Sequence, residues 1–171
     1  FHMLRTQAYK RPRKPLIAFT PKQLLRLSAA ASHIDEFTSG SFQPIIGDTT
    51  ITDPSAVTRV LLCTGRLYYD LAKERAHRGD TSTAIIRLEQ LYPLPEAELA
   101  EALAQYPNAT VTWVQDEPRN QGAWPHLALN LFPSLGRPVR LVSRPESATT
   151  AAGRASLHKE QAATLIAQAF E

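Results

Sequence analysis

The stretch from Leu88 to Trp124 reads LEQLYPLPEAELAEALAQYPNATVTWVQDEPRNQGAW and decides the fold. It contains the end of one predicted strand, a proline-flanked turn, a helix, a second strand and a final polar turn. Strands that alternate with helices of this length are typical of parallel sheets. Such sheets concentrate function at the carboxyl ends of their strands. Two of these ends lie in this stretch, at Glu89-Gln90 and at Asp116-Glu117.

The same alternation continues on both sides of this stretch, from Thr58 to the last residue. Short apolar runs predict buried strands, and longer amphipathic runs predict helices. We expect strands over 60–63, 83–88, 110–115 and 139–142, and helices over 67–78, 95–105, 120–131 and 158–170. The pattern therefore predicts an α/β fold, an open parallel or mixed sheet of four or five strands with helices on both faces.

The first 56 residues follow a different pattern. Residues 1–9 and 22–31 have helical composition, and the apolar run 16–19 predicts a buried strand. Residues 32–56 are rich in Ser, Thr, Asp, Gly and Pro, which is typical of a linker. We therefore expect three parts, namely the end of a preceding domain (1–31), a linker (32–56) and the main domain (57–171).

Composition places the chain among globular proteins. Its 171 residues are 43% hydrophobic and 20% charged. No apolar run approaches the roughly 18–20 residues that a membrane span needs, and we expect no signal peptide, because the opening residues lack a basic n-region and an apolar h-region. The opening FHMLRTQ lacks an initiator Met, which predicts a fragment of a longer polypeptide. Cys63 is the single cysteine, so no internal disulfide is expected and a cytoplasmic location fits.

Charge is distributed unevenly along the chain. Residues 1–26 carry seven of the 19 Lys and Arg residues and no acid. The remaining residues carry the other 12 basic residues and all 16 acidic ones, which gives them a net charge of −4. A basic segment on an acidic body could contact an anion or an acidic partner, but a solvated strip, or one that faces an acidic neighbouring domain, is the commoner case. Nucleic-acid binding is not expected, because no aromatic interleaving or known motif accompanies the charge.

Two strand ends are candidates for ligand binding. Thr64-Gly65-Arg66-Leu67 opens a helix, where backbone N–H groups can hold an anion. One glycine is far from a dinucleotide fingerprint, however, so a tight strand-to-helix turn is favoured. Gln90 could donate a hydrogen bond to a ligand, or it could satisfy a carbonyl of its own turn.

No catalytic set emerges from the remaining polar residues. Asp116 and Glu117 could suggest acid–base chemistry, but adjacent strand residues point to opposite faces. We therefore expect the two acids not to share a site, and one of them to cap the helix that starts near Asn120. The five histidines lack metal-ligand spacing, Cys63 lies in an apolar strand, and no nucleophile elbow is present. The residues thus predict no catalytic, cofactor-binding or metal-binding side chain.

Several motifs, taken in order, resemble one family. They are FHMLR (1–5), TPKQLLR (20–26), LCTGRLYY (62–69), RLEQLYP (87–93), EPRNQGAW (117–124), SRPESA (143–148) and SLHKEQ (156–161). Together they resemble the C-terminal region of the thiamine-diphosphate-dependent dehydrogenase component of the 2-oxoglutarate dehydrogenase complex. The related actinobacterial 2-oxoglutarate decarboxylase is included. The resemblance spans essentially the whole chain.

The resemblance implies a fold and a role. It implies a transketolase-like C-terminal domain, preceded by the end of a pyrimidine-binding domain. The full-length enzyme would be a cytoplasmic homodimer that decarboxylates 2-oxoglutarate on thiamine diphosphate and Mg²⁺. It would then pass the succinyl group to a lipoyl group of the dihydrolipoyl succinyltransferase component, within a multienzyme complex of the tricarboxylic acid cycle. Because the family's cofactor-binding residues lie upstream, this fragment alone is expected to be inactive and to support dimerisation.

One regulatory site can be carried over from the resemblance. Actinobacterial members bind acetyl-CoA as an activator, at positions that correspond here to Thr6, Ser41, Pro44, Gln90, Ala97 and Glu98. Only Gln90 keeps the family's residue type, and Glu98 would repel the phosphates of coenzyme A. We therefore expect acetyl-CoA to bind weakly or not at all. The alternative function is a free-standing α/β regulatory module that holds a nucleotide or anion at Gly65 and Gln90.

Overall fold

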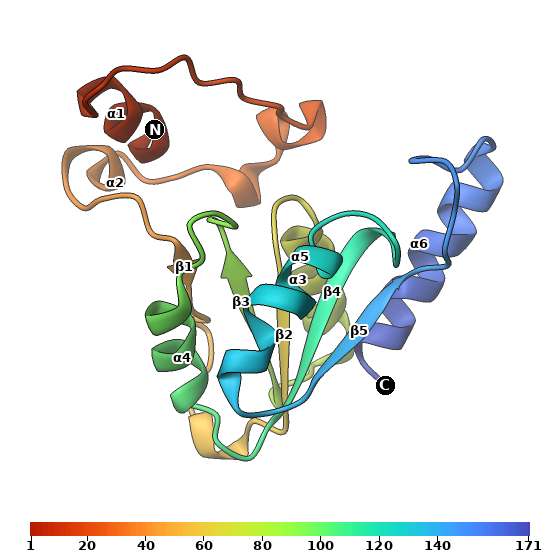
Figure 1. Ribbon diagram of the computed structural model, residues 1–171. Helices are drawn as coiled ribbons and strands as arrows, with labels where there is room; N and C mark the ends of the chain where they lie inside the picture. The colour runs from red at the N-terminus through yellow and green to blue at the C-terminus, as the bar shows by residue number, and fades with distance from the viewer. The chain divides into compact units, whose positions relative to one another are not determined.

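The computed structural model describes all 171 residues (Figure 1). The chain divides into two compact units, Phe1–Gln43 and Pro44–Glu171. The units are described separately below. None of the helices in either unit combines the length and the apolar character that a membrane crossing requires.

The second unit is built on a five-stranded mixed sheet, as predicted. Its strands are β1 (Ile45–Ile46), β2 (Arg59–Cys63), β3 (Thr83–Leu88), β4 (Thr110–Pro118) and β5 (Val139–Arg144). Their order is β1-β3-β2-β4-β5; the last four are parallel, and β1 is antiparallel to β3. The chain leaves β2 for β3 on one side and later returns to β4 on the other. The topological switch point, where α/β sheets usually bind ligands, therefore lies between β2 and β4.

Helices cover both faces of this sheet, which confirms the predicted layers (Figure 1). One face carries α3 (Leu67–Arg78) and α6 (Ala155–Ala169), and the other carries α4 (Glu96–Ala104) and α5 (Trp124–Asn130). Two 3₁₀ turns, Pro54–Ala56 and Phe132–Leu135, complete the unit. Helix α3 matches its predicted bounds because Gly79 adopts a left-handed conformation there, with φ of 62°, and ends the helix.

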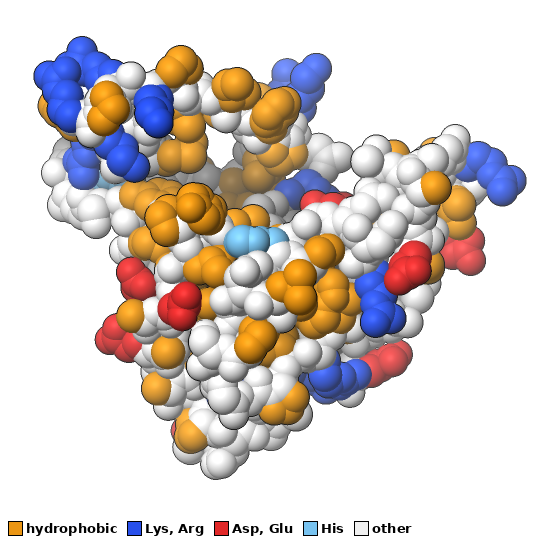
Figure 2. Space-filling model, viewed as in Figure 1, with side chains coloured by type: hydrophobic (Ala, Val, Ile, Leu, Met, Phe, Trp, Pro, Cys, Tyr) orange, Lys and Arg blue, Asp and Glu red, His pale blue; other side chains and the backbone are white.

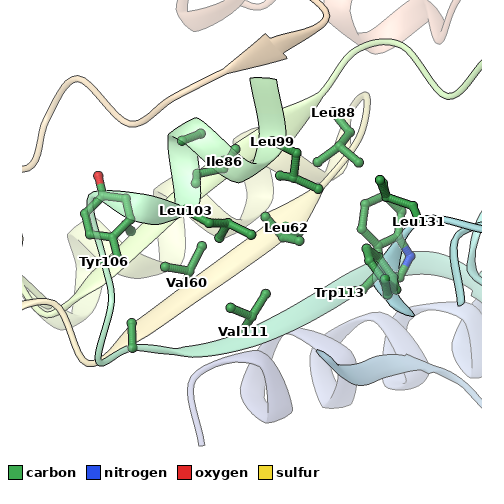
Figure 3. Close-up of a cluster of buried hydrophobic side chains, with 14 of the residues drawn as sticks. Val60, Leu62, Ile86, Leu88, Leu99, Leu103, Tyr106, Val111, Trp113 and Leu131 are labelled. Atoms are coloured by element: carbon green, nitrogen blue, oxygen red, sulfur yellow. The ribbon is translucent and has the colours of Figure 1, made fainter. Parts of the chain in front are cut away.

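Each face of the sheet has its own hydrophobic core. Alternate residues of β2 supply the two cores, because successive side chains point to opposite faces. Val60 and Leu62 belong to the core beneath α4 and α5, which Figure 3 shows, and Leu61 and Cys63 belong to the core beneath α3 and α6. Burial raises the pKa of the Cys63 thiol to about 12, so the thiol is inert, as expected from its apolar strand.

The first unit has no comparable core. It contains α1 (His2–Tyr9), α2 (Asp35–Thr38) and two 3₁₀ turns, Lys22–Arg26 and Ser28–Ala30, and none of its residues is buried. A few polar contacts connect α1 with the segment around α2, such as the 2.6 Å hydrogen bond from His2 Nε2 to the Glu36 carbonyl. Hydrophobic side chains and Lys or Arg side chains lie close together on its surface (upper left in Figure 2).

Three predictions for the amino-terminal third are wrong. Residues 16–19 form no strand, since the run has no neighbouring strand to pair with, and Phe19 is 95% exposed. Residues 22–31 form 3₁₀ turns in place of a helix. The predicted linker, 32–56, contains α2 and also β1, which pairs with β3. The compact sheet unit therefore begins at Pro44, while the assignment of the earlier residues to a pyrimidine-binding domain stays a prediction.

Candidate functional site

The carboxyl edge of the sheet holds a network of charged side chains at the switch point. Arg66 follows β2 in the turn that opens α3, and Asp116 lies near the end of β4. Arg66 Nη2 donates to Asp116 Oδ2 at 2.9 Å, and Arg66 also pairs with Asp70 on α3. Arg144, at the end of β5, donates from Nη2 to Asp116 Oδ1 at 2.6 Å. Asp116 therefore bridges two arginines that come from opposite sides of β4.

Arg144 extends the network to the last helix. Its Nε donates to the Asp116 carbonyl at 2.6 Å, and its Nη1 donates to the His158 carbonyl and to Gln161 Oε1, at 3.2 and 3.1 Å. Only 8% of the side chain is exposed. A buried guanidinium needs this many acceptors, because an unpaired buried charge costs several kcal/mol, about 3–5 when one partner of a pair is removed. Arg144 thus joins β4, β5 and α6.

Asp116 is held in its charged form by this arrangement. Burial by itself would raise the pKa of the carboxyl group. The hydrogen bonds and positive charges of Arg144 and Arg66 outweigh that effect, and the pKa lies below its ordinary value of 3.8. At neutral pH the carboxylate is therefore a fixed negative charge between two fixed positive charges, and it is poorly suited to accept and release a proton.

Gln115 shapes the turn that follows β4. The strand bulges between Val114 and Pro118, and the buried Gln115 amide fills the space inside the turn. Its Oε1 accepts from Trp113 Nε1 at 3.0 Å and from the Trp124 backbone N–H at 2.9 Å. Its Nε2 donates to the carbonyls of Pro118 and Gln121, at 3.0 and 2.8 Å. One amide thus fixes both ends of the polar turn.

Gly122 closes the same turn in a conformation that favours glycine. Its φ is 68°, and a Cβ atom built there would lie 2.9 Å from Glu117 Cβ and 3.1 Å from Gln115 Nε2. Most side chains avoid this backbone region, and the space is also filled. The glycine of the EPRNQGAW motif is therefore required by the geometry of the turn.

A second loop, residues 145–154, is tied to this turn. Asn120 Nδ2 and Gln121 Nε2 both donate to the Ser147 carbonyl, at 3.0 and 2.8 Å, and Asn120 Oδ1 accepts from the Ser147 N–H. A cavity of about 350 Å³ lies beside the joined loops, lined by Asp116, Arg144, Ser147, Thr149, His158 and Gln161 among others. A groove of about 630 Å³ between α3 and α6 reaches Arg66 and Asp116 from the other side.

The other predicted site residues contribute no side chain to this network. Gly65 has φ of 62° and forms the tight turn that was favoured over an anion site. Gln90 Nε2 donates to the Pro93 carbonyl at 2.8 Å, so the side chain satisfies its own turn. Ala97 and Glu98 are exposed in the first turn of α4.

The two adjacent acids behave differently from each other. Asp116 is partly buried in the network and Glu117 is exposed, a difference that fits the alternation of side chains along a strand. The prediction that one of them caps a helix near Asn120 is wrong. Helix α5 begins only at Trp124, and its first turn receives Gln115 Oε1 as an acceptor.

Sequence reasoning missed Gln115, Arg144 and the buried pair formed by Asp48 and Arg75. A weak signal was available for the first, since Gln115 is a polar residue that directly follows the apolar pair Trp113 and Val114. Arg144, Asp48 and Arg75 lie in polar stretches of sequence that are typical of exposed segments. Only the folded chain brings their partners within hydrogen-bonding distance. Their partners are 28 residues away for Arg144 and 27 residues away for Arg75.

A metal-dependent cofactor does not fit the residues of this chain. No group of three or more His, Cys, Asp or Glu side chains is placed to hold a metal ion. Asp116, the acid nearest the switch point, is occupied by Arg66 and Arg144. The Mg²⁺ and diphosphate that the resemblance implies therefore find no ligand set among these residues.

Comparison with known proteins gives one consistent result. The family profile described as "2-oxoglutarate dehydrogenase C-terminal" matches residues 31–170. The 2-oxoglutarate dehydrogenase E1 components of Haemophilus influenzae and Azotobacter vinelandii are 43% and 44% identical over 99% of this chain. The 2-oxoglutarate dehydrogenase E1/E2 component of Corynebacterium glutamicum is 45% identical over 100% of it.

The match covers this chain but only a small part of each relative. The chain spans 18%, 19% and 14% of the lengths of these three proteins, respectively. The resemblance that the motifs indicated is thereby confirmed over the full length of the chain, and the α/β fold agrees with it. The chain belongs to the 2-oxoglutarate dehydrogenase C-terminal family.

Proposed function

We propose that this chain is a non-catalytic C-terminal domain that stabilises the structure and the dimer of a thiamine-diphosphate-dependent 2-oxoglutarate dehydrogenase component. In the whole protein, 2-oxoglutarate is decarboxylated in the cytoplasm and its succinyl group passes to a lipoyl group of the dihydrolipoyl succinyltransferase component. Support comes from the family match and from the names of the relatives. Thiamine diphosphate and Mg²⁺ would supply the decarboxylation chemistry from another part of that protein.

One observation carries the structural role. The charged groups at the carboxyl edge of the sheet are engaged with each other, because Asp116 accepts from both Arg66 and Arg144. A reacting site needs a base or nucleophile that can reach the substrate. Here the same groups tie β4, β5, α3 and α6 together, and the amides of Asn120 and Gln121 hold the adjoining loop. These contacts therefore hold the carboxyl edge of the sheet in one conformation.

The first unit supports a role in assembly. Eleven of the thirteen large hydrophobic side chains that are exposed in the whole chain lie within Phe1–Gln43. These residues carry seven Lys and Arg and two acids, a net charge of +5. Apolar surface of this density is usually buried against a partner, and the charge fits an acidic one. We assign it to contacts with the rest of the pyrimidine-binding domain or with the other subunit of a homodimer.

The experiment compares the 171-residue chain with the full-length protein. With thiamine diphosphate and Mg²⁺ added, the full-length protein should consume 2-oxoglutarate and the chain alone should not. In the full-length protein, Asp116→Asn should leave kcat within about threefold while lowering the unfolding temperature, because Asp116 stabilises the fold through its ion pairs with Arg66 and Arg144. Glu74→Gln, which removes an exposed ion pair with Arg78, is the matched control. Turnover by the chain alone would refute the proposal.

The effector site is a separate proposal that rests on the same assignment. Gln90 keeps the family's residue type, but its amide already donates to Pro93, and Glu98 stands exposed nearby in sequence. We expect acetyl-CoA to bind the full-length enzyme weakly or not at all. The measurement is a titration of decarboxylase activity with acetyl-CoA. Strong activation that Gln90→Ala abolishes would show that this expectation is wrong.

The regulatory-module alternative predicts a different result. A free-standing nucleotide or anion receptor should gain thermal stability when its ligand is added to the isolated chain. A scan of the chain with ATP and with inorganic phosphate separates the two functions. A structural domain should show no shift with either compound.

A further inference from the structure

The outer edge of β3, on the side away from β2, is only partly covered by another strand. Strand β2 pairs with the inner edge along Thr83–Arg87, but β1 covers the outer edge for two residues only. An open strand edge exposes backbone N–H and C=O groups that can pair with another chain. The remaining outer groups of β3 must therefore find other partners.

Every second residue along that edge has an outward-facing backbone group with a hydrogen-bond partner. The Glu89 N–H donates to the Pro44 carbonyl at 2.8 Å, and Arg87 lies opposite Ile46 in the β1 ladder. At Ile85 and Thr83, the next two outward-facing positions, side chains supply the hydrogen-bond partners. The Ile85 N–H donates to Asp48 Oδ2 at 2.8 Å, and the Thr83 carbonyl accepts from Arg75 Nη1 at 3.0 Å.

The position of Asp48 follows from the β1 register. Ile46 lies opposite Arg87, so two further residues of an antiparallel strand would bring residue 48 opposite Ile85. The chain bends away there, because Asp48 Oδ1 accepts from the backbone N–H of Thr50 at 3.0 Å. The carboxylate then occupies the place of the carbonyl that a longer strand would offer to Ile85.

The two side chains form a closed unit. Asp48 and Arg75 are paired with each other and their side chains are only 4% and 11% exposed. Arg75 Nη2 donates to Thr50 Oγ1 at 2.7 Å. Burial would raise the pKa of Asp48, but the hydrogen bonds from Thr50, Arg75 and Ile85 outweigh it and leave the pKa below 3.8. Asp48 is therefore a carboxylate at neutral pH, and both of its oxygens accept hydrogen bonds, Oδ1 from Thr50 and Oδ2 from Arg75 and Ile85.

We propose that the Asp48–Arg75 pair is an edge lock, which keeps β3 from adding a strand of a second copy of this chain. The segment Thr83-Ala84-Ile85-Ile86 is uncharged and mostly β-branched, a composition that pairs readily with itself. Two equal edges meet antiparallel around a two-fold axis, which makes β3 of another copy the partner that fits. The lock thus combines stability with protection against self-association.

The test uses the 171-residue chain with Asp48→Ala, Asp48→Asn and Arg75→Met, and Glu74→Gln as the control from the same helix. Hydrogen exchange of the Ile85 amide should be about tenfold faster in the Asp48→Ala and Arg75→Met variants at low concentration. At high concentration, light scattering should show their association beyond that of the parent chain, and the Ile85 amide should become protected again. Asp48→Asn keeps an acceptor oxygen but loses the charge, so it should fold and show a smaller change.

Three results would overturn the edge lock. In the first, folded variants keep the mass of the parent chain at every concentration. In the second, they associate while the Ile85 amide stays unprotected, which would assign the contact to another surface. In the third, Glu74→Gln associates to the same extent. Near-ultraviolet circular dichroism of the buried Trp113 reports whether each variant is folded.

Discussion

Two apolar runs of the same length show how differently the two units use hydrophobic sequence. Leu16-Ile17-Ala18-Phe19 lies in the first unit, and Val60-Leu61-Leu62-Cys63 lies in the second. The second run is fully buried because β3 and β4 flank it and helices cover both faces. In the first run Ile17 is 78% exposed. Burial therefore depends on neighbours that the run itself does not specify.

The largest effect is expected where the second run is packed most tightly. Leu62→Ala should lower the free energy of unfolding by about 2–5 kcal/mol, because a side chain with no exposed surface leaves a cavity behind. Urea denaturation followed by tryptophan fluorescence gives the value. A loss below about 1 kcal/mol would show that the core beneath α4 and α5 can collapse around the missing atoms.

Acid should weaken the second unit through Asp48 and Asp116, with a smaller effect than that of Leu62→Ala. Asp48 and Asp116 have folded-state pKa values below the ordinary 3.8, so both favour the folded state while the carboxylates are charged. Their contribution is present above about pH 4 and is lost as the pH falls toward the folded-state values. Urea denaturation at pH 5 and pH 3 should show this loss. Asp116→Asn should make the decrease shallower, whereas an unchanged slope would exclude Asp116 as a source.

The smallest effect is expected in the first unit. Phe19→Ser should change the free energy of unfolding by no more than about 0.5 kcal/mol, since the side chain is 95% exposed. The same change should reduce self-association of the chain at high concentration, measured by light scattering, because it removes exposed apolar surface. A large loss of stability would mean that the two runs are less different than their exposures indicate.

The sheet unit could be predicted largely from its pattern. Helix α3 and strand β3 match their predicted bounds, and the other strands and helices of the α/β core differ at their ends. The reason is local, because period and glycine stops act within a few residues. The prediction of a strand over 16–19 was wrong because a short apolar run does not specify what covers it. Such a run is equally compatible with a buried strand and with an exposed surface segment.

The site was predictable only in part. Side chains at the carboxyl ends of β2 and β4 meet in one network, and the different burial of Asp116 and Glu117 fits strand alternation. Gln90, at the predicted strand end of β3, instead bonds within its own turn. The partners of Asp116 could not be found in this way, since Arg66 is 50 residues away and Arg144 is 28 residues away. The role of Asp48 was hidden for the same reason, as its segment has the composition of a linker.

By itself, the sequence determined the alternation of strands and helices, the bounds of α3 and β3, and the family to which the chain belongs. These depend on periodicity, on backbone conformation and on motifs that lie within short stretches. Tertiary structure alone decided which charges meet and which apolar residues are covered. Pairs such as Arg75 with Asp48 form only when β1, β3 and α3 are assembled, because contact between distant residues is a property of the packed fold.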